Sequence, residues 1–128
     1  MIEDRSFSIR LSKDWHYDSF ENSYSIYKND GIGALTLSSY SNTDIGKQNS
    51  VALLDRFVKN RGKIESLVIN GQESAKSIFK DKVDEYIIYS WVICGKNNFV
   101  LLTYNYKDLE NNNEISELLE MVNSLIVK

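Results

Sequence analysis

The chain has 128 residues, of which 42% are hydrophobic and 26% charged, and its formal net charge at pH 7 is −3. This size and composition predict a single globular domain over residues 1–128. The acidic balance argues against nucleic acid or an anionic membrane as a partner, and no run approaches the ~20 apolar residues that a membrane span needs. Residues 1–5 lack the apolar block of a signal peptide, so we expect a cytoplasmic protein.

The chain opens with residues that favour strands. Residues 7–11 alternate apolar and polar side chains, which is typical of a strand with one buried face. Residues 24–28 and 33–40 predict two more strands, joined through a turn at residues 29–31 that is rich in turn-forming residues. Between the first two of these strands, we expect the aromatic cluster over residues 15–20 to lie in a loop.

A helix is predicted after a polar loop at residues 41–48. Asn49 or Ser50 is the expected N-cap, because both side chains accept hydrogen bonds from the first turn of a helix. Gly62 is the expected left-handed stop. The predicted apolar stripe of this helix is Val51, Leu54, Phe57 and Val58.

Four further strands are predicted in the second half of the chain. Residues 64–69 and 72–79 flank an Asn-Gly pair, which suits a two-residue hairpin turn because both central positions need positive φ. Residues 85–94 and 99–106 form a second hairpin. In this hairpin both alternate sets of side chains are apolar or aromatic, so both of its faces need cover from other parts of the molecule.

The last predicted element is a helix that follows a polar break at residues 107–113. Its apolar face is Ile115, Leu118, Leu119, Val122, Leu125 and Ile126, with Glu114 and the remaining polar residues on the other face. We therefore predict an α+β fold, a mostly antiparallel sheet of about seven strands in an α/β/α sandwich. The alternative places both helices on one face of the sheet and a dimer partner on the other.

The opening at residues 7–11, followed by a polar turn and Trp15, resembles the PsbP/Mog-like superfamily. Residues 33–40, a capped helix, two aromatic-rich strands and a final helix ending near residues 124–126 are similar to the rest of that pattern. The resemblance implies an antiparallel sheet flanked by helices. It also implies a non-catalytic bacterial binding protein, since members act as photosystem subunits, a small-GTPase partner, or chaperones and accessory factors. The resemblance implies no shared set of catalytic residues.

Residues for catalysis or metal binding are scarce. Cys94 and His16 are the only thiol and imidazole, and their predicted positions give no reason to bring them together. One histidine and one cysteine are too few for a zinc site. We therefore expect neither an enzyme nor a cofactor or metal.

Aromatic residues are the strongest candidates for a binding surface, because tyrosine combines a large rigid area with a polar tip. We select His16, Tyr17, Tyr104 and Tyr106 as candidate partner-binding residues. The alternative for Tyr104 and Tyr106 is that a helix covers them as part of the core.

The first hypothesis for function is a protein-binding domain, an accessory, chaperone or immunity-type partner that buries a segment of another polypeptide. A second hypothesis is a small-molecule binding module or weak enzyme with a tyrosine-lined pocket between sheet and helix. A third is a homodimer that associates through its sheet faces.

Overall fold

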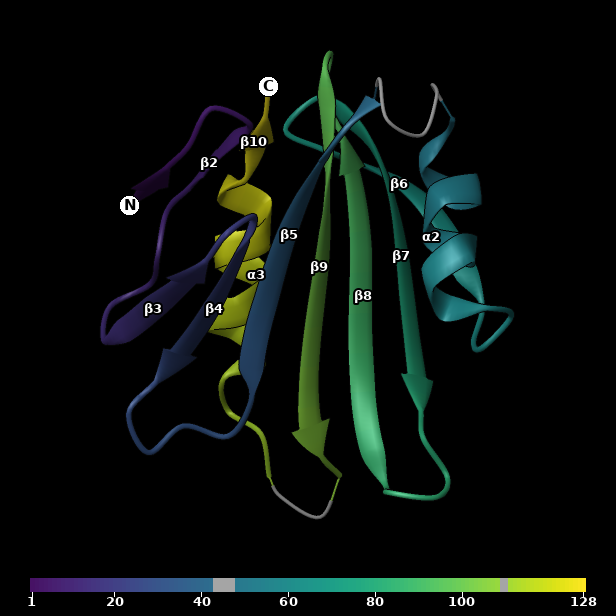
Figure 1. Ribbon diagram of the computed structural model, residues 1–128. Helices are drawn as coiled ribbons and strands as arrows, with labels where there is room; N and C mark the ends of the chain where they lie inside the picture. The colour runs from purple at the N-terminus through teal and green to yellow at the C-terminus, as the bar shows by residue number, and fades with distance from the viewer. Residues whose placement is uncertain (43–47, 109–110) are drawn as a thin grey trace.

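The computed structural model describes residues 1–42, 48–108 and 111–128 (Figure 1). Most of the predicted loop at 41–48 and part of the predicted break at 107–113 lie outside these residues. The described chain forms two antiparallel sheets and two helices, α2 (Ser50–Val58) and α3 (Ile115–Ser124). The α+β class predicted from the sequence is confirmed.

The larger sheet has seven strands in the order β3-β4-β5-β9-β8-β7-β6, and every neighbouring pair is antiparallel. Long central strands and short edge strands give it a twisted shape. The strands are β3 (Trp15–Phe20), β4 (Ser23–Lys28), β5 (Ala34–Ser41), β6 (Ile64–Ile69), β7 (Gln72–Lys80), β8 (Tyr86–Cys94) and β9 (Asn98–Lys107).

A smaller sheet joins the two ends of the described chain. Its strands are β1 (Ile2–Glu3), β2 (Phe7–Ile9) and β10 (Ile126–Val127), with β2 in the middle. Phe7 and Ile9 are buried, and the Phe7 ring packs edge-on against Tyr24 of β4 with 5.5 Å between ring centroids. The small sheet therefore shares the hydrophobic core of the large one.

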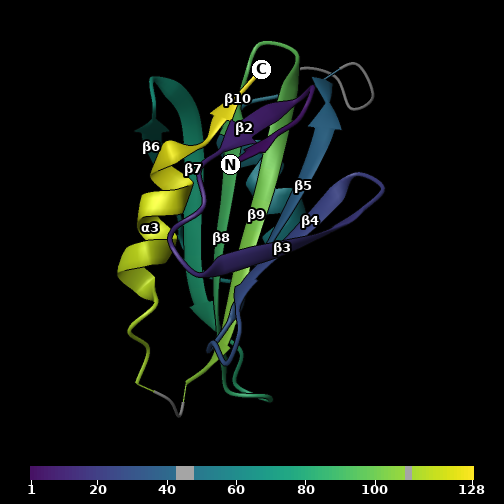
Figure 2. The ribbon, with the colours of Figure 1, turned by 90° about the vertical axis from the view of Figure 1, so that its left-hand side faces the viewer.

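The two helices lie on opposite faces of the large sheet. On one side, Trp91 and Leu102 belong to a core cluster with α3 and the small sheet. On the other side, Val92 and Phe99 pack beneath Leu54 of α2. Figures 1 and 2 show α2 beside β6 and β7, and α3 on the other side of the sheet. The double apolar pattern of the central hairpin is thus explained by one helix on each side.

Helix α2 begins where the sequence predicts but presents a different stripe. The Asn49 side chain accepts a hydrogen bond from the Ala52 amide at 2.8 Å, as an N-cap does. Val51 is 38% exposed, whereas Leu53, which the prediction omitted, is buried. The left-handed residue that caps the end of the helix is Lys59 and not Gly62, although Gly62 also has a positive φ, of +81°. Leu54 and Val58 of the predicted stripe are buried. The predictions for Val51 and for the residue that ends the helix were wrong, because small changes in helix rotation and length do not show in the sequence pattern.

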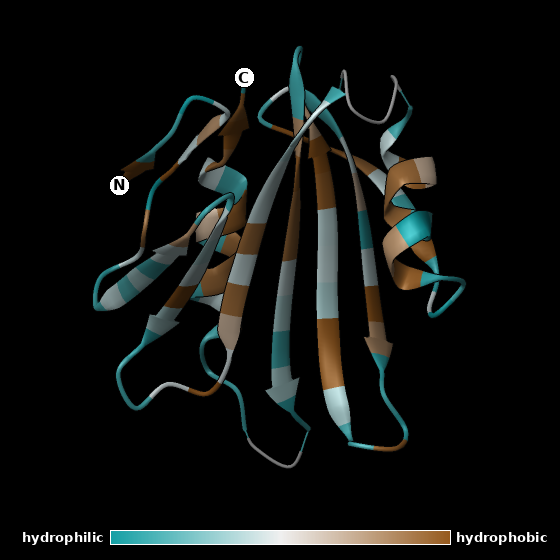
Figure 3. Cartoon of the chain, in the orientation of Figure 1, coloured by the Kyte–Doolittle hydropathy of each residue, from teal (hydrophilic) through white to brown (hydrophobic). Residues whose placement is uncertain are grey.

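Three strands, β1, β3 and β10, were also missed by sequence reasoning. Residues 15–20, predicted as a loop, form β3 at the edge of the large sheet. Only Trp15 of this strand is buried, so the strand lacks the apolar alternation that marks half-buried strands. Figure 3 shows β3 coloured mostly hydrophilic, in contrast with the broad hydrophobic stretches of β8. Ile126, predicted on the apolar helix face, lies in β10 and is 50% exposed.

Candidate functional site

Each helix covers only part of its sheet face, and this decides which side chains reach the surface. On the α3 side, directly opposed residues form a row across six strands. The middle of the row is buried, whereas Ile78 at one end and Tyr17 at the other are 45% and 46% exposed. From β7 to β3, the row is Ile78, Tyr89, Tyr104, Leu35, Ile26 and Tyr17.

The best candidate site is a surface that we call the tyrosine face, formed by Lys76, Ile78, Ile87, Tyr89 and Tyr106. These side chains come from β7, β8 and β9 and lie on the α3 side of the sheet, because they alternate with residues that pack under α2. Ile78 is exposed and the other four are partly exposed. The tyrosine face therefore combines apolar area with partial access to solvent.

The aromatic rings of the tyrosine face hold one another in place. The ring centroids of Tyr89 and Tyr106 lie 6.4 Å apart, and that of Tyr106 lies 5.8 Å from Tyr104 beneath it. Such tilted aromatic contacts stabilise a rigid arrangement. Burial raises the pKa of Tyr106, with smaller contributions from the neighbouring Tyr89 and Asp108. The Tyr106 hydroxyl therefore remains a neutral hydrogen-bonding group at physiological pH.

A single positive charge lies among these rings. The Lys76 ammonium is 5.8 Å from the Tyr89 ring centroid and 5.7 Å from that of Trp91. Among the described residues no carboxylate lies within ion-pair distance of Lys76. A cation over aromatic rings is stabilised by their electron density and still offers its remaining hydrogens to a ligand.

Tyr104 does not contribute to the surface. It is fully buried, and its hydroxyl donates a hydrogen bond to the Glu114 carboxylate at 2.8 Å. The same carboxylate accepts hydrogen bonds from the Ile32 and Gly33 amides, both at 3.1 Å. Glu114 is 1% exposed, so its predicted place on the polar helix face was wrong. Tyr104 and Glu114 join the start of α3 to the β4–β5 loop.

The structure separates the four residues that the sequence analysis selected. Tyr104 and Tyr106 are neighbours on β9, whereas His16 and Tyr17 lie on β3 at the far end of the sheet. Tyr17 shares a row with Tyr104, and three strand spacings correspond to roughly 14 Å. His16 points to the other side of the sheet, near Tyr27 and Asn29. The four residues therefore do not form one site.

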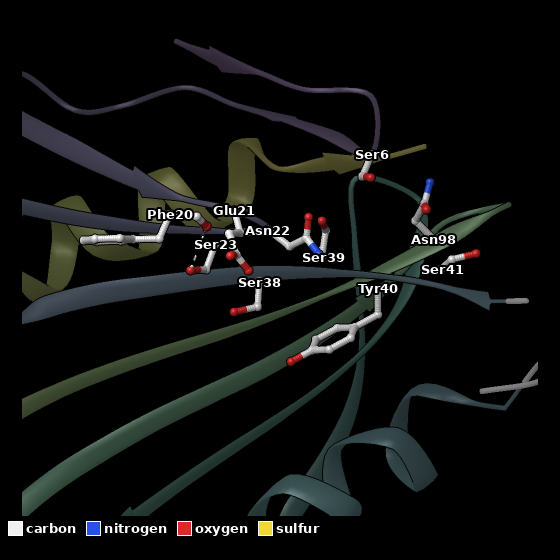
Figure 4. Close-up of a pocket in the computed structure, with 10 residues that line it drawn as sticks. All are labelled: Ser6, Phe20, Glu21, Asn22, Ser23, Ser38, Ser39, Tyr40, Ser41 and Asn98. Carbon is white, nitrogen blue, oxygen red and sulfur yellow. Dashed lines mark hydrogen bonds between the residues drawn. The ribbon is translucent and has the colours of Figure 1, made fainter. Parts of the chain in front are cut away.

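A second candidate is an open pocket of about 660 Å³ around the β3–β4 turn and the end of β5. Figure 4 shows Ser38 and Tyr40 on one side of β5 and Ser39 and Ser41 on the other, so these polar groups do not converge on one point. The lining residues are Ser6, Phe20, Glu21, Asn22, Ser23, Ser38, Ser39, Tyr40, Ser41 and Asn98.

The sequence analysis predicted a tyrosine-lined pocket between sheet and helix, and the pocket beside α2 has a different lining. The hollow between α2 and the sheet measures about 150 Å³, and its lining residues include Phe57, Phe79 and Thr103 but no tyrosine. The described residues also contain no group of three or more histidine, cysteine, aspartate or glutamate side chains placed to hold a metal ion. Cys94 on β8 and His16 on β3 are separated by three strands.

No family model and no curated protein matches the chain. Solved structures resemble it in fold. A Bacteroides thetaiotaomicron protein matches with a TM-score of 0.67 and 16% identity over 95% of this chain, which spans 45% of that protein's length. LpqN of Mycobacterium tuberculosis, involved in cell envelope biogenesis, matches with a TM-score of 0.63 and 10% identity over 98% of this chain and 86% of LpqN.

Cyanobacterial PsbP (CyanoP) from Synechocystis matches with a TM-score of 0.58 and 10% identity, over 99% of this chain and 95% of CyanoP. The chain therefore has the PsbP-like fold that the sequence resemblance implied. Identities this low establish the fold alone. In the part of the chain that the structure describes, neither helix has the length and apolar character needed to span a bilayer.

Proposed function

We propose that this chain is a non-enzymatic protein-binding domain, and that it holds an apolar segment of another polypeptide on the tyrosine face. The proposal includes a single domain over residues 1–128 and a cytoplasmic location. The observation that carries it is an exposed Ile78 beside Tyr89 and Tyr106, on a sheet surface that α3 leaves uncovered.

The composition of the tyrosine face suits a polypeptide better than a metabolite. Tyrosine is enriched in protein-binding hot spots, because it supplies a large rigid area with a polar tip. A pocket beside Ile78 on this sheet surface measures about 140 Å³ and is lined by Lys63, Glu65, Lys76 and Ile78. Small-molecule sites are generally larger and more enclosed.

The charge on the tyrosine face restricts the partner's chemistry. The Lys76 ammonium has no ion-pair partner within the described residues, so a carboxylate brought in by the partner would pair with it. The protein's net charge of −3 disfavours a strongly acidic ligand elsewhere on its surface. We therefore expect a segment with two or three apolar side chains and one Asp or Glu.

Selection from a display library of random peptides tests this proposal. The wild-type domain should enrich apolar sequences that carry an acidic residue, and the Ile78→Lys/Tyr106→Ala variant should lose at least about tenfold in affinity for them. Tyr86→Ala is the matched control, because Tyr86 is 41% exposed on the same hairpin but faces the α2 side. Equal binding by both variants would exclude the tyrosine face as the binding surface.

A second candidate function is the binding of a polar small molecule in the pocket of Figure 4. The pocket's volume, about 660 Å³, falls in the range of ligand sites, and hydroxyl and amide groups line most of it. A thermal-shift screen of sugars and other polyhydroxylated compounds tests it. A stabilising compound whose effect disappears in Ser38→Ala/Tyr40→Phe supports this function, and a screen without any stabilising compound counts against it.

A further inference from the structure

The outer edge of β3 is an unpaired sheet edge. Strand β3 ends the seven-stranded order and pairs only with β4. All of its residues except Trp15 are exposed, with Tyr17 at 46% and Phe20 at 65%. In Figure 2, which looks at this edge, β3 lies across the near side of the sheet. Its outward amide and carbonyl groups are thus available to another strand.

β3 lacks the features by which proteins usually block such an edge. Its pairing with β4 runs without a bulge from Trp15 to Phe20. The strand contains neither lysine nor proline, and the whole chain contains no proline at all. Bulges, lysines, prolines and covering loops are the common means of preventing edge-to-edge pairing. Asp18 is the one formally charged side chain of the strand, so a partner strand must pair without placing a carboxylate opposite it.

His16 and Asp18 of β3 are complementary in one antiparallel register, because an imidazole N–H can donate a hydrogen bond to a carboxylate. When two copies are related by a two-fold axis normal to the sheet, the residue on the axis faces itself and its neighbours face each other in reverse order. With Tyr17 on the axis, His16 of each copy faces Asp18 of the other, so the pairing contains two favourable pairs. Both side chains lie on the α2 side of the sheet and are exposed.

The two neighbouring registers are less favourable for pairing, because neither places His16 opposite Asp18. With Asp18 on the axis, two carboxylates face each other directly. With His16 on the axis, the two imidazole rings face each other and neither faces Asp18. Like charges at opposed positions destabilise strand pairing, whereas opposite charges and aromatic pairs stabilise it. The His16–Asp18 pairs and the separation of the two Asp18 carboxylates thus favour the register that also places the two Tyr17 rings together.

We propose that the partner for β3 is a second copy of this chain, joined edge to edge through β3 with Tyr17 on the two-fold axis, so that the two large sheets become one continuous sheet. This interface is distinct from the tyrosine face, which lies at the other end of the sheet. It leaves that face open in both copies. A dimer of this kind buries only a small area, and we expect it to be weak and concentration-dependent.

Sedimentation equilibrium over a wide range of protein concentrations tests the proposal through a charge swap. Wild type should show a reversible monomer–dimer equilibrium. His16→Asp replaces both favourable pairs by carboxylate pairs and should weaken the dimer at least about tenfold. The double variant His16→Asp/Asp18→His restores complementarity and should restore the dimer. A monomeric wild type, or a double variant no tighter than the single one, would overturn the proposal.

Disulfide trapping gives an independent readout that does not depend on charge. In a Cys94→Ala background, Tyr17→Cys places two thiols opposite each other across the axis, where the expected Cα separation of about 4.5–5.5 Å permits a disulfide. Tyr17→Cys should form a covalent dimer under mild oxidation at micromolar concentration. Val68→Cys, 70% exposed on the opposite edge strand β6, is the control. Equal or faster crosslinking by Val68→Cys would contradict pairing through β3.

Discussion

Tyr104 and Glu114 meet inside the core, where the tyrosine hydroxyl donates a 2.8 Å hydrogen bond to the carboxylate. The carboxylate is 1% exposed and also accepts from two backbone amides of the β4–β5 loop. A buried carboxylate is tolerated only when such bonds replace its hydration. These contacts fix the start of α3 against the sheet and so determine how far the helix covers β9.

Glu114→Gln should lower the free energy of unfolding by about 2–4 kcal/mol, because the amide group places a donor where the carboxylate accepts from other donors. Urea denaturation measures the loss. Glu117→Gln is the matched control on the same helix: Glu117 is partly exposed and bonds Trp15 and Lys28. Its loss should be about 1 kcal/mol. Equal losses in the two variants would show that the buried contacts of Glu114 stabilise the fold no more than the partly exposed contacts of Glu117.

The fold should lose stability at alkaline pH through Tyr104. Burial is the main cause that raises the pKa of Tyr104 above its ordinary value near 10, the Asn112 amide lowers it, and Glu114 raises it again. The unfolded chain therefore loses this proton at a lower pH than the folded chain does. Its contribution to stability is complete below about pH 10 and is lost as the pH rises above that value.

Urea midpoints at about pH 8 and about pH 11 measure this effect. The decrease between the two pH values should be smaller in Tyr104→Phe than in wild type, because phenylalanine has no proton to lose. The same decrease in both proteins would contradict the assignment to Tyr104.

Cys94 should react slowly with thiol reagents. Burial, followed by the nearby Glu73 charge, raises the pKa of Cys94 to about 11, well above the ordinary value of a thiol. The thiolate is the reactive form, so a shift of this size lowers the rate near pH 8 by about 100-fold relative to an ordinary thiol. Reaction with a disulfide reagent, followed by absorbance, gives the rate. Protein unfolded in urea should react at the ordinary rate, and fast modification of the folded protein would contradict the prediction.

Gly33→Ala should destabilise the protein more than Gly71→Ala. A Cβ at Gly33 would lie 2.6 Å from the Asn105 carbonyl oxygen and 2.6 Å from Cζ of Tyr104, so the buried contacts there must shift. We expect a loss of about 2–3 kcal/mol. At Gly71 nothing lies within 4 Å, and the cost comes only from a φ of +73°, about 1 kcal/mol. Thermal and urea unfolding of both variants check the order.

The parts of the fold that the sequence predicted are those with strong apolar patterns. The central hairpin at residues 85–106 and the Asn70–Gly71 turn are confirmed, and both turn residues have positive φ. β3 was missed because an edge strand exposed on both faces needs no apolar alternation. Its aromatic residues were interpreted as a cluster in a loop. Their placement in a strand becomes clear only from the pairing of β3 with β4.

The candidate binding residues were harder to predict than the fold. Tyr104 and Tyr106 are two positions apart on the same strand, and their sequence surroundings are alike. Their exposure differs because α3 and Glu114 cover one and not the other, a property of tertiary packing. The role of Lys76 was not predicted, because its aromatic neighbours come from the adjacent strand β8. A search for lysines opposite aromatic residues in predicted hairpins would have found it.

The small sheet has a consequence for synthesis on the ribosome. Strand β2 near the start of the chain pairs with β10, whose register places Val127 opposite Phe7. The small sheet therefore cannot be completed until residue 127 has left the exit tunnel. Until then the apolar side chains of β2 are incompletely covered. Contacts so distant in sequence form slowly. The interval between emergence of the central hairpin and arrival of β10 is when the nascent chain is most exposed to aggregation and to chaperones.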